Sequence, residues 1–315
     1  MTTETTQDRA LLQLVHALRE RGYHFITPTP LTHQRVNKRI ENQLAKDLAG
    51  VFGWSRPFSQ ELLPPAIFSL MDQAGALAPC DAHWRSRVRI SSLDGQLFVH
   101  SAYPTDAADA VFFGPDTYRF ANAILAHLNN HRGHIGRVVD IGCGSGAGGI
   151  LAALARPQAS VLAVDINPSA LRLTRNNAAL AGAENLTACH SDLLNDVEGE
   201  FDLILANPPY LVDPDERAYR HGGGPLGAGL SLAIFDSALE RLAPCGTLLL
   251  YTGVAMVGNQ DPFRREIEQR LEGRAFEWTY REVDPDVFGE ELLDGAYIEC
   301  DRIAAVVLEV TRPAD

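Results

Sequence analysis

The chain has 315 residues, of which 46% are hydrophobic and 21% are charged. This length allows one large domain or two ordinary ones, and the apolar fraction excludes disorder as the main state. The formal net charge is −13, and because residues 1–110 hold 11 basic and 11 acidic residues, the acidic excess lies in residues 111–315. An acidic protein repels a phosphate backbone at long range, which disfavours a nucleic acid partner without excluding one.

Targeting and redox signals are missing from the sequence. No apolar run reaches the ~18 residues that a membrane helix needs, and the N-terminal segment MTTETTQDRA lacks the basic-then-apolar pattern of a secretory signal. The five cysteines are scattered and never spaced C-x-x-C, which argues against a disulfide framework and a structural zinc site. We therefore expect a cytoplasmic protein with no metal and no membrane partner.

Residues 1–110 are expected to form a smaller, mainly helical domain with a β-hairpin. The apolar stripes of its first two predicted helices are Leu11, Leu14, Val15 and Leu18 and, after Thr32 as N-cap, Val36, Ile40, Leu44 and Leu48. A further helix is expected over 65–76, after two prolines. Two β-rich runs flank Asp94-Gly95, which predicts a hairpin.

From about residue 111, short apolar strand runs alternate with helices. The seven strand candidates span residues 137–142, 160–165, 186–192, 201–207, 246–253, 276–283 and 302–310. A helix over 168–181 is predicted by Asn167 as N-cap, Pro168 at the first helical position and Gly182 beyond its end. Residues 111–315 therefore predict an α/β fold with a seven-stranded, mostly parallel, Rossmann-like sheet. No helix-length connection joins the last two candidates, so the final strand is expected to be antiparallel.

The first strand of this sheet runs into a glycine-rich turn that begins with an acidic residue, Asp140, and contains Gly142, Gly144 and Gly146. Glycines let the backbone bend sharply and approach a ligand closely. The second strand ends at Asp165, which can accept hydrogen bonds from ribose hydroxyls, and the third is followed by Asp192, which can accept from an exocyclic amine.

The same turn contains a formal G-x-G-x-x-G pattern, which is also found in dinucleotide sites. The carboxylate of Asp140 would repel a pyrophosphate, so an adenosine-like ligand is favoured over a dinucleotide.

The most specific motif follows the fourth strand: Asn207-Pro208-Pro209-Tyr210. The two prolines fix the backbone and remove two N–H donors, which leaves a stiff loop of acceptors. Such a loop suits a substrate –NH2 group, because an amide or aryl amine nitrogen is a poor nucleophile until its hydrogens are held and its developing charge is stabilised. Tyr210 offers a flat face on which a planar amide or base can stack.

The glycine turn, the two later acids and the N-P-P-Y tetrapeptide together resemble the class I S-adenosylmethionine-dependent methyltransferases of the N-P-P-Y type. This "methyltransferase small domain" group includes release-factor glutamine and ribosomal RNA N-methyltransferases. The resemblance covers residues 111–310 and implies that Asn207 and the Pro208 carbonyl bind the target nitrogen, with Pro209 and Tyr210 completing the catalytic motif. The cofactor-binding residues that it implies are Asp140, Gly142, Gly144, Gly146, Asp165, Asp192 and Asn207, with Phe113 and Thr117 from a stretch that covers the cofactor.

The substrate is indicated by the segment that follows the tetrapeptide. The long loop over 211–229, rich in glycine, is expected to form part of the substrate wall, and His221 is expected to be an ordinary loop histidine. The Gly-Gly…Gly-Leu pattern of this loop is similar to that of the release-factor glutamine methyltransferases. Net acidity and this loop favour a protein glutamine amide, in a translation factor or ribosomal protein, as the acceptor.

Three alternatives stay open. Arg85, Arg87 and Arg89 alternate as on one strand face, and with Arg35, Lys38 and Arg39 they predict an RNA-contacting patch, so the acceptor can be a base amine in RNA or DNA. A small-molecule amine or amide is the second alternative. A non-catalytic cofactor-binding subunit is the third. The sequence does not indicate an oligomeric state or the number of methyl groups added.

Overall fold

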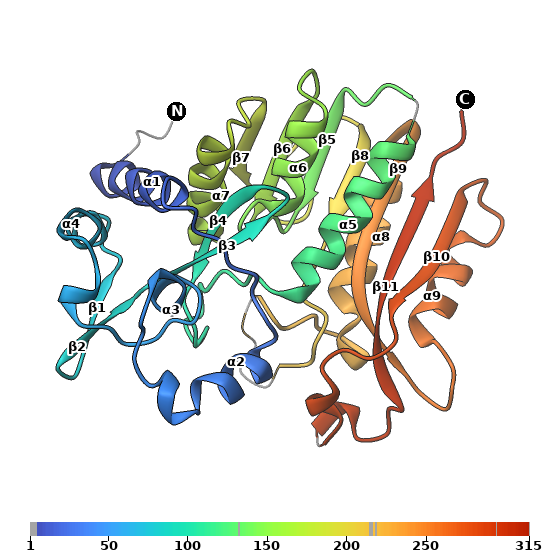
Figure 1. The fold of residues 1–315 in the computed structure, drawn as a ribbon. Helices are drawn as coiled ribbons and strands as arrows, with labels where there is room; N and C mark the ends of the chain where they lie inside the picture. The colour runs from blue at the N-terminus through green and yellow to red at the C-terminus, as the bar shows by residue number, and fades with distance from the viewer. Residues whose placement is uncertain (1–4, 132, 214–216, 218, 294, 315) are drawn as a thin grey trace.

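The structure is a computed structural model and describes residues 5–131, 133–213, 217, 219–293 and 295–314. A seven-stranded sheet with the order β10-β11-β9-β8-β5-β6-β7 forms its centre (Figure 1). Its strands are β5 (Arg137–Ile141), β6 (Ser160–Asp165), β7 (Leu186–His190), β8 (Phe201–Ala206), β9 (Leu242–Met256), β10 (Glu277–Asp284) and β11 (Arg302–Thr311). β11 pairs antiparallel with both neighbours, and the other pairs are parallel. The predicted fold class is therefore confirmed.

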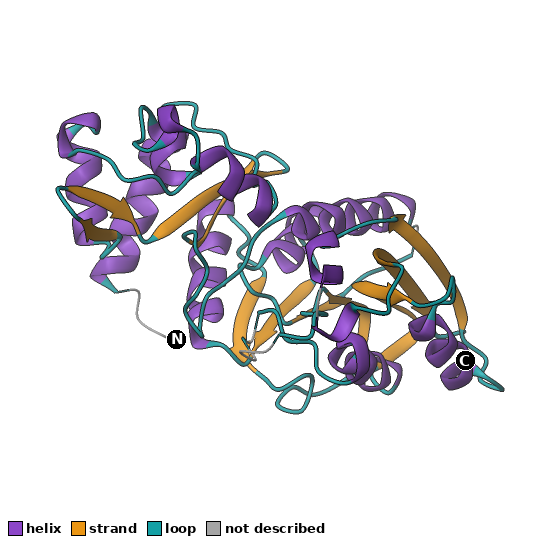
Figure 2. Cartoon of the chain, turned by 90° about the horizontal axis from the view of Figure 1, so that it is seen from below, coloured by secondary structure: helices purple, strands orange, loops and turns teal. Residues whose placement is uncertain are grey.

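Helices cover both faces of the sheet (Figure 2). One face carries α5 (Pro115–Asn130), α6 (Ala147–Ala155) and α7 (Pro168–Ala181), and the other carries α8 (Gly229–Leu239) and α9 (Pro262–Leu271). Because successive strand residues point to opposite faces, Val138 joins the core under α5 and α6, while Val139 joins the core under α8 and α9. No described helix is both long and apolar enough to span a bilayer.

The N-terminal elements have a separate core that includes Leu14, Phe52, Phe58 and Met71. They comprise α1 (Thr6–Arg19), α2 (Pro30–Asn37), α3 (Leu48–Phe52), α4 (Pro65–Gln73), β1 (Leu77–Cys80), β2 (His83–Ser86), β3 (Val88–Leu93) and β4 (Gln96–Ser101). The predicted hairpin is β3–β4, which turns at Asp94-Gly95 with positive φ at both residues. A second antiparallel hairpin, β1–β2, was not predicted.

The prediction of one continuous second helix after Thr32 is wrong. Thr29 is the N-cap of α2, which ends at Asn37, and the chain continues through a 3-10 turn over Ile40–Asn42 before α3. The Asn42 side chain donates to the Val36 carbonyl, which a continuing helix would need for its own hydrogen bond. Ile40 is 91% exposed, so its apolar character marks no core position.

The predicted arginine face is also wrong. Arg85 lies in β2 and Arg89 in β3, whereas Arg87 lies between the two strands. Arg89 is buried, donates to the Gly53 carbonyl at 2.9 Å and lies over the Phe25 ring. The alternation of the three residues therefore does not produce a shared basic surface.

Asn177 of α7 connects the N-terminal hairpin to the glycine turn. Its side chain accepts from the Val99 N–H at 2.8 Å and donates to the carbonyls of Val99 and Ser145 at 3.0 and 2.9 Å. Leu180 of α7 belongs to the N-terminal core. The helix that follows β6 thus contacts both parts of the chain.

Candidate active site

A cavity of about 380 Å³ lies at the carboxyl ends of β5, β6, β7 and β8. The carboxyl edge of a parallel sheet is where α/β proteins bind ligands. The predicted site residues that line the cavity are Asp140, Gly142, Gly144, Asp165, Asp192, Asn207, Pro208, Pro209, Tyr210 and Thr117. Gly146 and Phe113 lie outside this lining: Gly146 precedes α6, and Phe113 stacks on His100 in the core. The neighbouring Phe112 lines the cavity instead.

Asp140 is a buried carboxylate at the end of β5. Its Oδ2 accepts from the Gly149 N–H of α6 at 2.7 Å. Burial raises the pKa of Asp140 to about 7, and the nearby Asp165 carboxylate adds to the increase. A cationic group that enters the cavity would favour ionisation of Asp140 and would be stabilised by it.

The glycine turn and Asp165 form one hydrogen-bonded unit. Gly142 and Gly144 have φ values of +66° and +55°, which side chains rarely adopt, so glycine is required there. The Gly144 N–H donates to Asp165 Oδ2 at 3.0 Å, and the Asn167 N–H donates to Oδ1 at 2.9 Å. Burial raises the pKa of Asp165. Each Asp165 oxygen keeps a lone pair for a ligand hydroxyl.

Asp192 lines the cavity and lies two residues after the end of β7. It is exposed, and its backbone N–H donates to Asp196. The following residue, Leu193, lines the cavity and has a φ of +51°. The third predicted acid is thus present at the rim, with an apolar neighbour beside it.

The N-P-P-Y tetrapeptide leaves β8 and enters the cavity wall. Among the described residues, the Asn207 side-chain amide forms no hydrogen bond with the protein, so its oxygen is available to a ligand. Tyr210 is different, because it is 6% exposed and its hydroxyl donates to Asp116 Oδ2 at 2.8 Å. Asp116 also lines the cavity but was not predicted as a site residue, since it lies 94 positions away in sequence.

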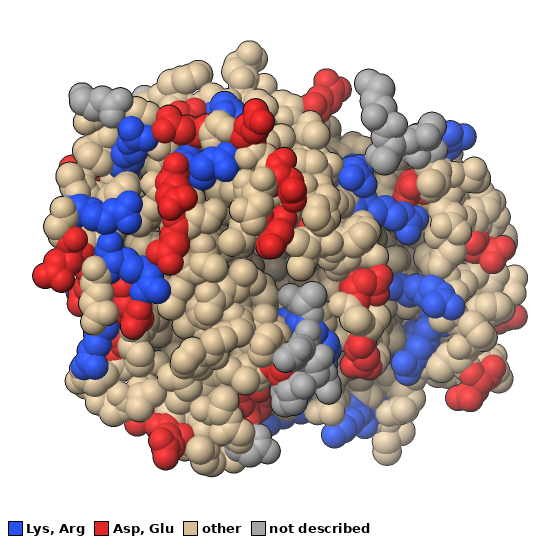
Figure 3. All heavy atoms as spheres, turned by 180° about the vertical axis from the view of Figure 1, so that it is seen from behind, with Lys and Arg blue, Asp and Glu red and all other residues tan. Residues whose placement is uncertain are grey.

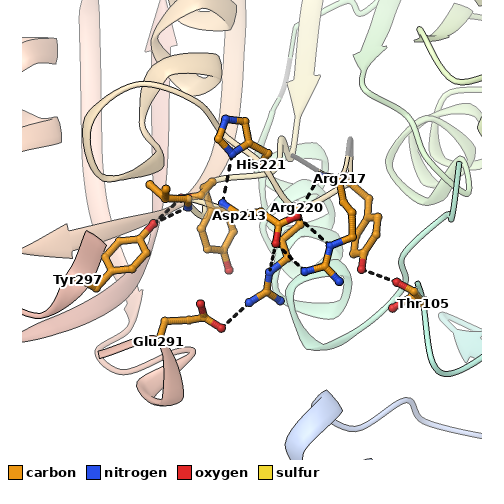
Figure 4. A network of polar contacts seen from close by, with 10 residues as sticks. Thr105, Asp213, Arg217, Arg220, His221, Glu291 and Tyr297 are labelled. Carbon is orange, nitrogen blue, oxygen red and sulfur yellow. Dashed lines mark hydrogen bonds and ion pairs between the residues drawn. The ribbon is translucent and has the colours of Figure 1, made fainter. Parts of the chain in front are cut away.

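The segment after the tetrapeptide is held by a charged network (Figure 4). Buried Asp213 binds Arg217 through Nε at 2.8 Å and approaches Arg220 Nε at 3.5 Å, and Arg220 also pairs with Glu291. The hydrogen bonds from Arg217 lower the pKa of Asp213 to about 2. Arg217 and Arg220 line the cavity, as does Tyr219, whose hydroxyl donates to the Thr105 carbonyl at 2.5 Å.

The predicted substrate-wall loop over 211–229 is described only in part, because residues 214–216 and 218 lie outside the described residues. His221 accepts from the Asp213 N–H through Nδ1 at 3.2 Å. Tyr297 supports the same segment, since its hydroxyl accepts from the Val212 N–H at 2.9 Å.

Comparisons with known proteins agree with this geometry. A sequence model of the methyltransferase small domain family matches residues 108–255. The release factor glutamine methyltransferase of Deinococcus radiodurans is 33% identical over 219 residues, which are 65% of this chain and 73% of that protein. The enzyme of the same name from Neisseria gonorrhoeae is 36% identical over 44% of this chain and 54% of that protein.

Solved structures share the fold. Trm5 of Methanocaldococcus jannaschii in complex with adenosine superposes with a TM-score of 0.50 and 17% identity, covering 80% of this chain and 69% of that one. This similarity establishes the fold and not the substrate. From the fold, the sequence relatives and the matched family model, the chain belongs to the release factor glutamine methyltransferase family and is an S-adenosylmethionine-dependent methyltransferase.

Proposed function

We propose that this protein is a cytoplasmic enzyme that methylates the side-chain amide nitrogen of a glutamine in a protein substrate of the release factor type. The observation that carries the proposal is the Asn207 side-chain amide, which has no hydrogen-bond partner among the residues that the structure describes and lies in one cavity with Asp140 and Asp165. The relatives at 33% and 36% identity are named as release factor glutamine methyltransferases. Because those matches cover 73% and 54% of the relatives, the substrate is part of the proposal.

The cavity fits S-adenosylmethionine. A ribose-binding role of Asp165 is supported by its two oxygens, which accept from the Gly144 N–H of the glycine turn and from the Asn167 N–H and keep further acceptor capacity. Asp140 is suited to the cationic methionine end, since the buried carboxylate lines the cavity and its recorded hydrogen bond comes from the backbone N–H of Gly149. Asp192 and Leu193 would hold the adenine ring, with Thr117 and Phe112 at the covering wall.

The tetrapeptide holds the acceptor nitrogen. When bound, S-adenosylmethionine supplies an electrophilic methyl group on a sulfonium. The Asn207 side-chain oxygen and the Pro208 carbonyl accept the two hydrogens of the substrate amide, which orients the nitrogen lone pair and stabilises the positive charge that develops on nitrogen. Tyr210 lines the same wall and provides an aromatic surface for the planar amide.

A protein acceptor is favoured over a nucleic acid. The predicted arginine face is dispersed, and Arg89 is buried. On the face shown in Figure 3, basic side chains are interspersed with acidic ones among the described residues. At the cavity mouth, Asp213 and Glu291 neutralise Arg217 and Arg220. The described cavity lining holds five aspartates and two arginines, and this excess of carboxyl groups disfavours a phosphate backbone.

The test is transfer of labelled methyl groups to purified release factor and to an extract from cells lacking the gene. We expect protease-sensitive label, located on a glutamine amide by peptide mass spectrometry, with wild-type enzyme and with Asn129→Ala as a matched control. Asn129 is an exposed asparagine of α5 far from the tetrapeptide in sequence. Label that is released by nuclease, or that passes a size filter untreated, would contradict the protein acceptor and point to a base amine or a small molecule.

A further inference from the structure

Tyr210 is fixed through its hydroxyl to a carboxylate on a different element. Asp116, in the first turn of α5, is 6% exposed and accepts from Tyr210 at 2.8 Å through Oδ2. Its Oδ1 accepts from the Tyr251 hydroxyl of β9 at 2.6 Å and from Arg119 Nη1 at 3.1 Å. Arg119 continues to Asp284 of β10 at 2.6 Å. One buried carboxylate thus joins the end of β8 to α5 and β9.

Three glycines approach the ring or the backbone of Tyr210 closely. A Cβ at Gly253 would lie 2.1 Å from Tyr210 Cε2, so the ring lies directly on the β9 backbone. Cβ atoms at Gly222 and Gly227 would lie 2.7 Å from the Tyr210 Cα and 2.0 Å from its carbonyl oxygen. The Phe288 ring meets the Tyr210 ring edge-on at 5.9 Å. The hydroxyl is therefore held by Asp116, and the rest of the residue is enclosed by glycines.

The three donors around Asp116 favour its ionised form, whereas burial raises the pKa of the carboxyl group. Two hydroxyls and a guanidinium donate to Asp116, and an ionised carboxylate accepts all of them without having to donate. Each of these bonds is charge-assisted, which makes it shorter and stronger than a bond between neutral groups. Arg119, flanked by Asp116 and Asp284, compensates the negative charge.

We propose that Asp116 is a positioning residue for methyl transfer, which acts through the Tyr210 hydroxyl to fix the loop that presents Asn207 and the Pro208 carbonyl to the substrate amide. The inference rests on the proposed function, because it takes the acceptor-binding role of Asn207 from there. Asp116 also lines the cavity, but its three bonds are directed at protein groups. The alternative is that Asp116 only stabilises the fold.

The kinetic test compares hydroxyl deletions. Tyr210→Phe and Tyr251→Phe each remove one bond to the same carboxylate, and Tyr280→Phe removes a bond of 2.6 Å to Asp261, away from the cavity lining. We expect Tyr210→Phe to lower kcat about tenfold, the effect of one charge-assisted hydrogen bond. We expect KM for the acceptor and Kd for S-adenosylmethionine to stay within about twofold. Tyr280→Phe is expected to keep kcat. Equal losses of kcat in Tyr210→Phe and Tyr280→Phe would overturn the proposal.

A double-mutant cycle isolates the coupling. Asp116→Asn is expected to lower kcat as much as Tyr210→Phe does. The double variant is expected to be no slower than Asp116→Asn alone, because both changes disrupt the same hydrogen bond between Tyr210 and Asp116. If the fold losses of kcat in the two single variants multiply in the double variant, Asp116 and Tyr210 act independently and the proposal is overturned. If Asp116→Asn does not fold, the comparison of Tyr210→Phe with Tyr280→Phe still decides.

A spectroscopic arm separates this inference from the substrate assignment. The side-chain amide signals of Asn207 in labelled enzyme, identified by their loss in Asn207→Asp, report on the loop without any acceptor. We expect one sharp pair of signals in wild-type and Tyr280→Phe enzyme, and shifted or multiple signals in Tyr210→Phe and Asp116→Asn. Unchanged signals in Tyr210→Phe would overturn the positioning role even if a protein acceptor is found. If the Asn207 signals change as expected but no protein acceptor is found, the positioning role of Asp116 is supported and only the proposed function is contradicted.

Discussion

Asp140 and Asp213 are both 2% exposed, yet their pKa values move in opposite directions. Asp140 accepts one backbone N–H, which does not compensate for the loss of water, so its pKa rises to about 7. Asp213 binds Arg217 and Arg220, which lower its pKa to about 2. Desolvation dominates at Asp140, whereas the arginine partners dominate at Asp213. Asp213 holds a loop in place, and we propose that Asp140 receives positive charge from the cofactor.

The raised pKa of Asp140 predicts a pH-dependent stability. The folded state binds the Asp140 proton more tightly than the unfolded chain, where the pKa is 3.8. The free energy of unfolding therefore falls by about 4 kcal/mol as pH rises from about 4 to about 7, when this group is taken alone. We expect Asp140→Asn to exceed wild type in stability at pH 8 and to lose that advantage at pH 4.5, in denaturant titrations. An equal difference at both pH values would rule this account out, and exposed Asp72→Asn serves as the control.

The proposed role of Asn207 predicts a lower kcat with little change in the affinity for the cofactor. Replacing Asn207 by Ala removes one of the two acceptors for the substrate amide, so we expect kcat to fall by about 100-fold or more. Calorimetric Kd for S-adenosylmethionine should stay within a few-fold of wild type, as in Asn129→Ala. A large loss of cofactor affinity would instead place Asn207 mainly in the cofactor site.

The proposed role of Asp165 predicts a weaker affinity for the cofactor as the first effect of its replacement. Asp165→Ala removes the proposed ribose acceptor and leaves the Gly144 N–H without its partner. We expect Kd for S-adenosylmethionine to rise by at least about tenfold, the effect of a hydrogen bond to a charged group. Titration calorimetry of the purified variant is the measurement. Normal cofactor binding would show that the ribose lies elsewhere.

Among the helices and strands, the features that depend on short sequence signals, such as caps and strand runs, were predicted correctly. The feature that depends on a particular side-chain contact was not. The expected caps of α7 are present, since Asn167 accepts from the Ser169 N–H and Gly182 adopts a φ of +73°. All seven predicted strands are present, and β5, β8 and β11 coincide with apolar runs because a strand buried on both faces needs them. The second predicted helix failed because Asn42 takes the Val36 carbonyl, a contact that spacing does not reveal.

The cavity residues were predictable from sequence where they lie in short motifs, and not where distant contacts bring them to the cavity. The residues of the cavity that were found from sequence sit in short motifs at strand ends, as Asn207 and Asp165 do. Asp116 was missed because its partners lie 94 and 135 positions away in sequence: Tyr210 in the loop after β8 and Tyr251 within β9. Arg89 was misplaced because alternation assumes one unbroken strand, and the chain changes from β2 to β3 at Arg87.

The contact between β4 and α7 predicts a large effect of one amide. Asn177→Ala would leave the N–H and carbonyl of Val99 and the carbonyl of Ser145 without this partner in a buried site. Each unsatisfied group costs about 1–3 kcal/mol, so we expect the free energy of unfolding to fall by about 3 kcal/mol or more. Exposed Asn129→Ala, unfolded in parallel, should be near neutral. A change below 1 kcal/mol, which is about the lower limit for one such group, would contradict this reading.

For the whole molecule, the division near residue 110 stays a prediction, and α7 shows how to test it. Leu180 is 4% exposed because the N-terminal core covers it, and Asp8 of α1 binds Arg172 at 2.7 Å. We expect residues 111–315 alone to unfold at least about 4 °C below the full chain, from the exposure of Leu180. Thermal melts of both proteins, with full-length Leu180→Ala for comparison, measure this. Equal melting temperatures would mean that the two parts are independent.

The glycines around Tyr210 have a consequence for how this sequence can diverge. Gly222, Gly227 and Gly253 approach Tyr210 too closely for any side chain, although they lie on two separate segments. A Cβ at Gly253 would meet the Tyr210 ring, whereas Cβ atoms at Gly222 and Gly227 would meet backbone atoms of residue 210. Among natural descendants of this gene, Gly253 and Tyr210 should therefore be inherited together, while Gly222 and Gly227 should persist whichever residue stands at position 210.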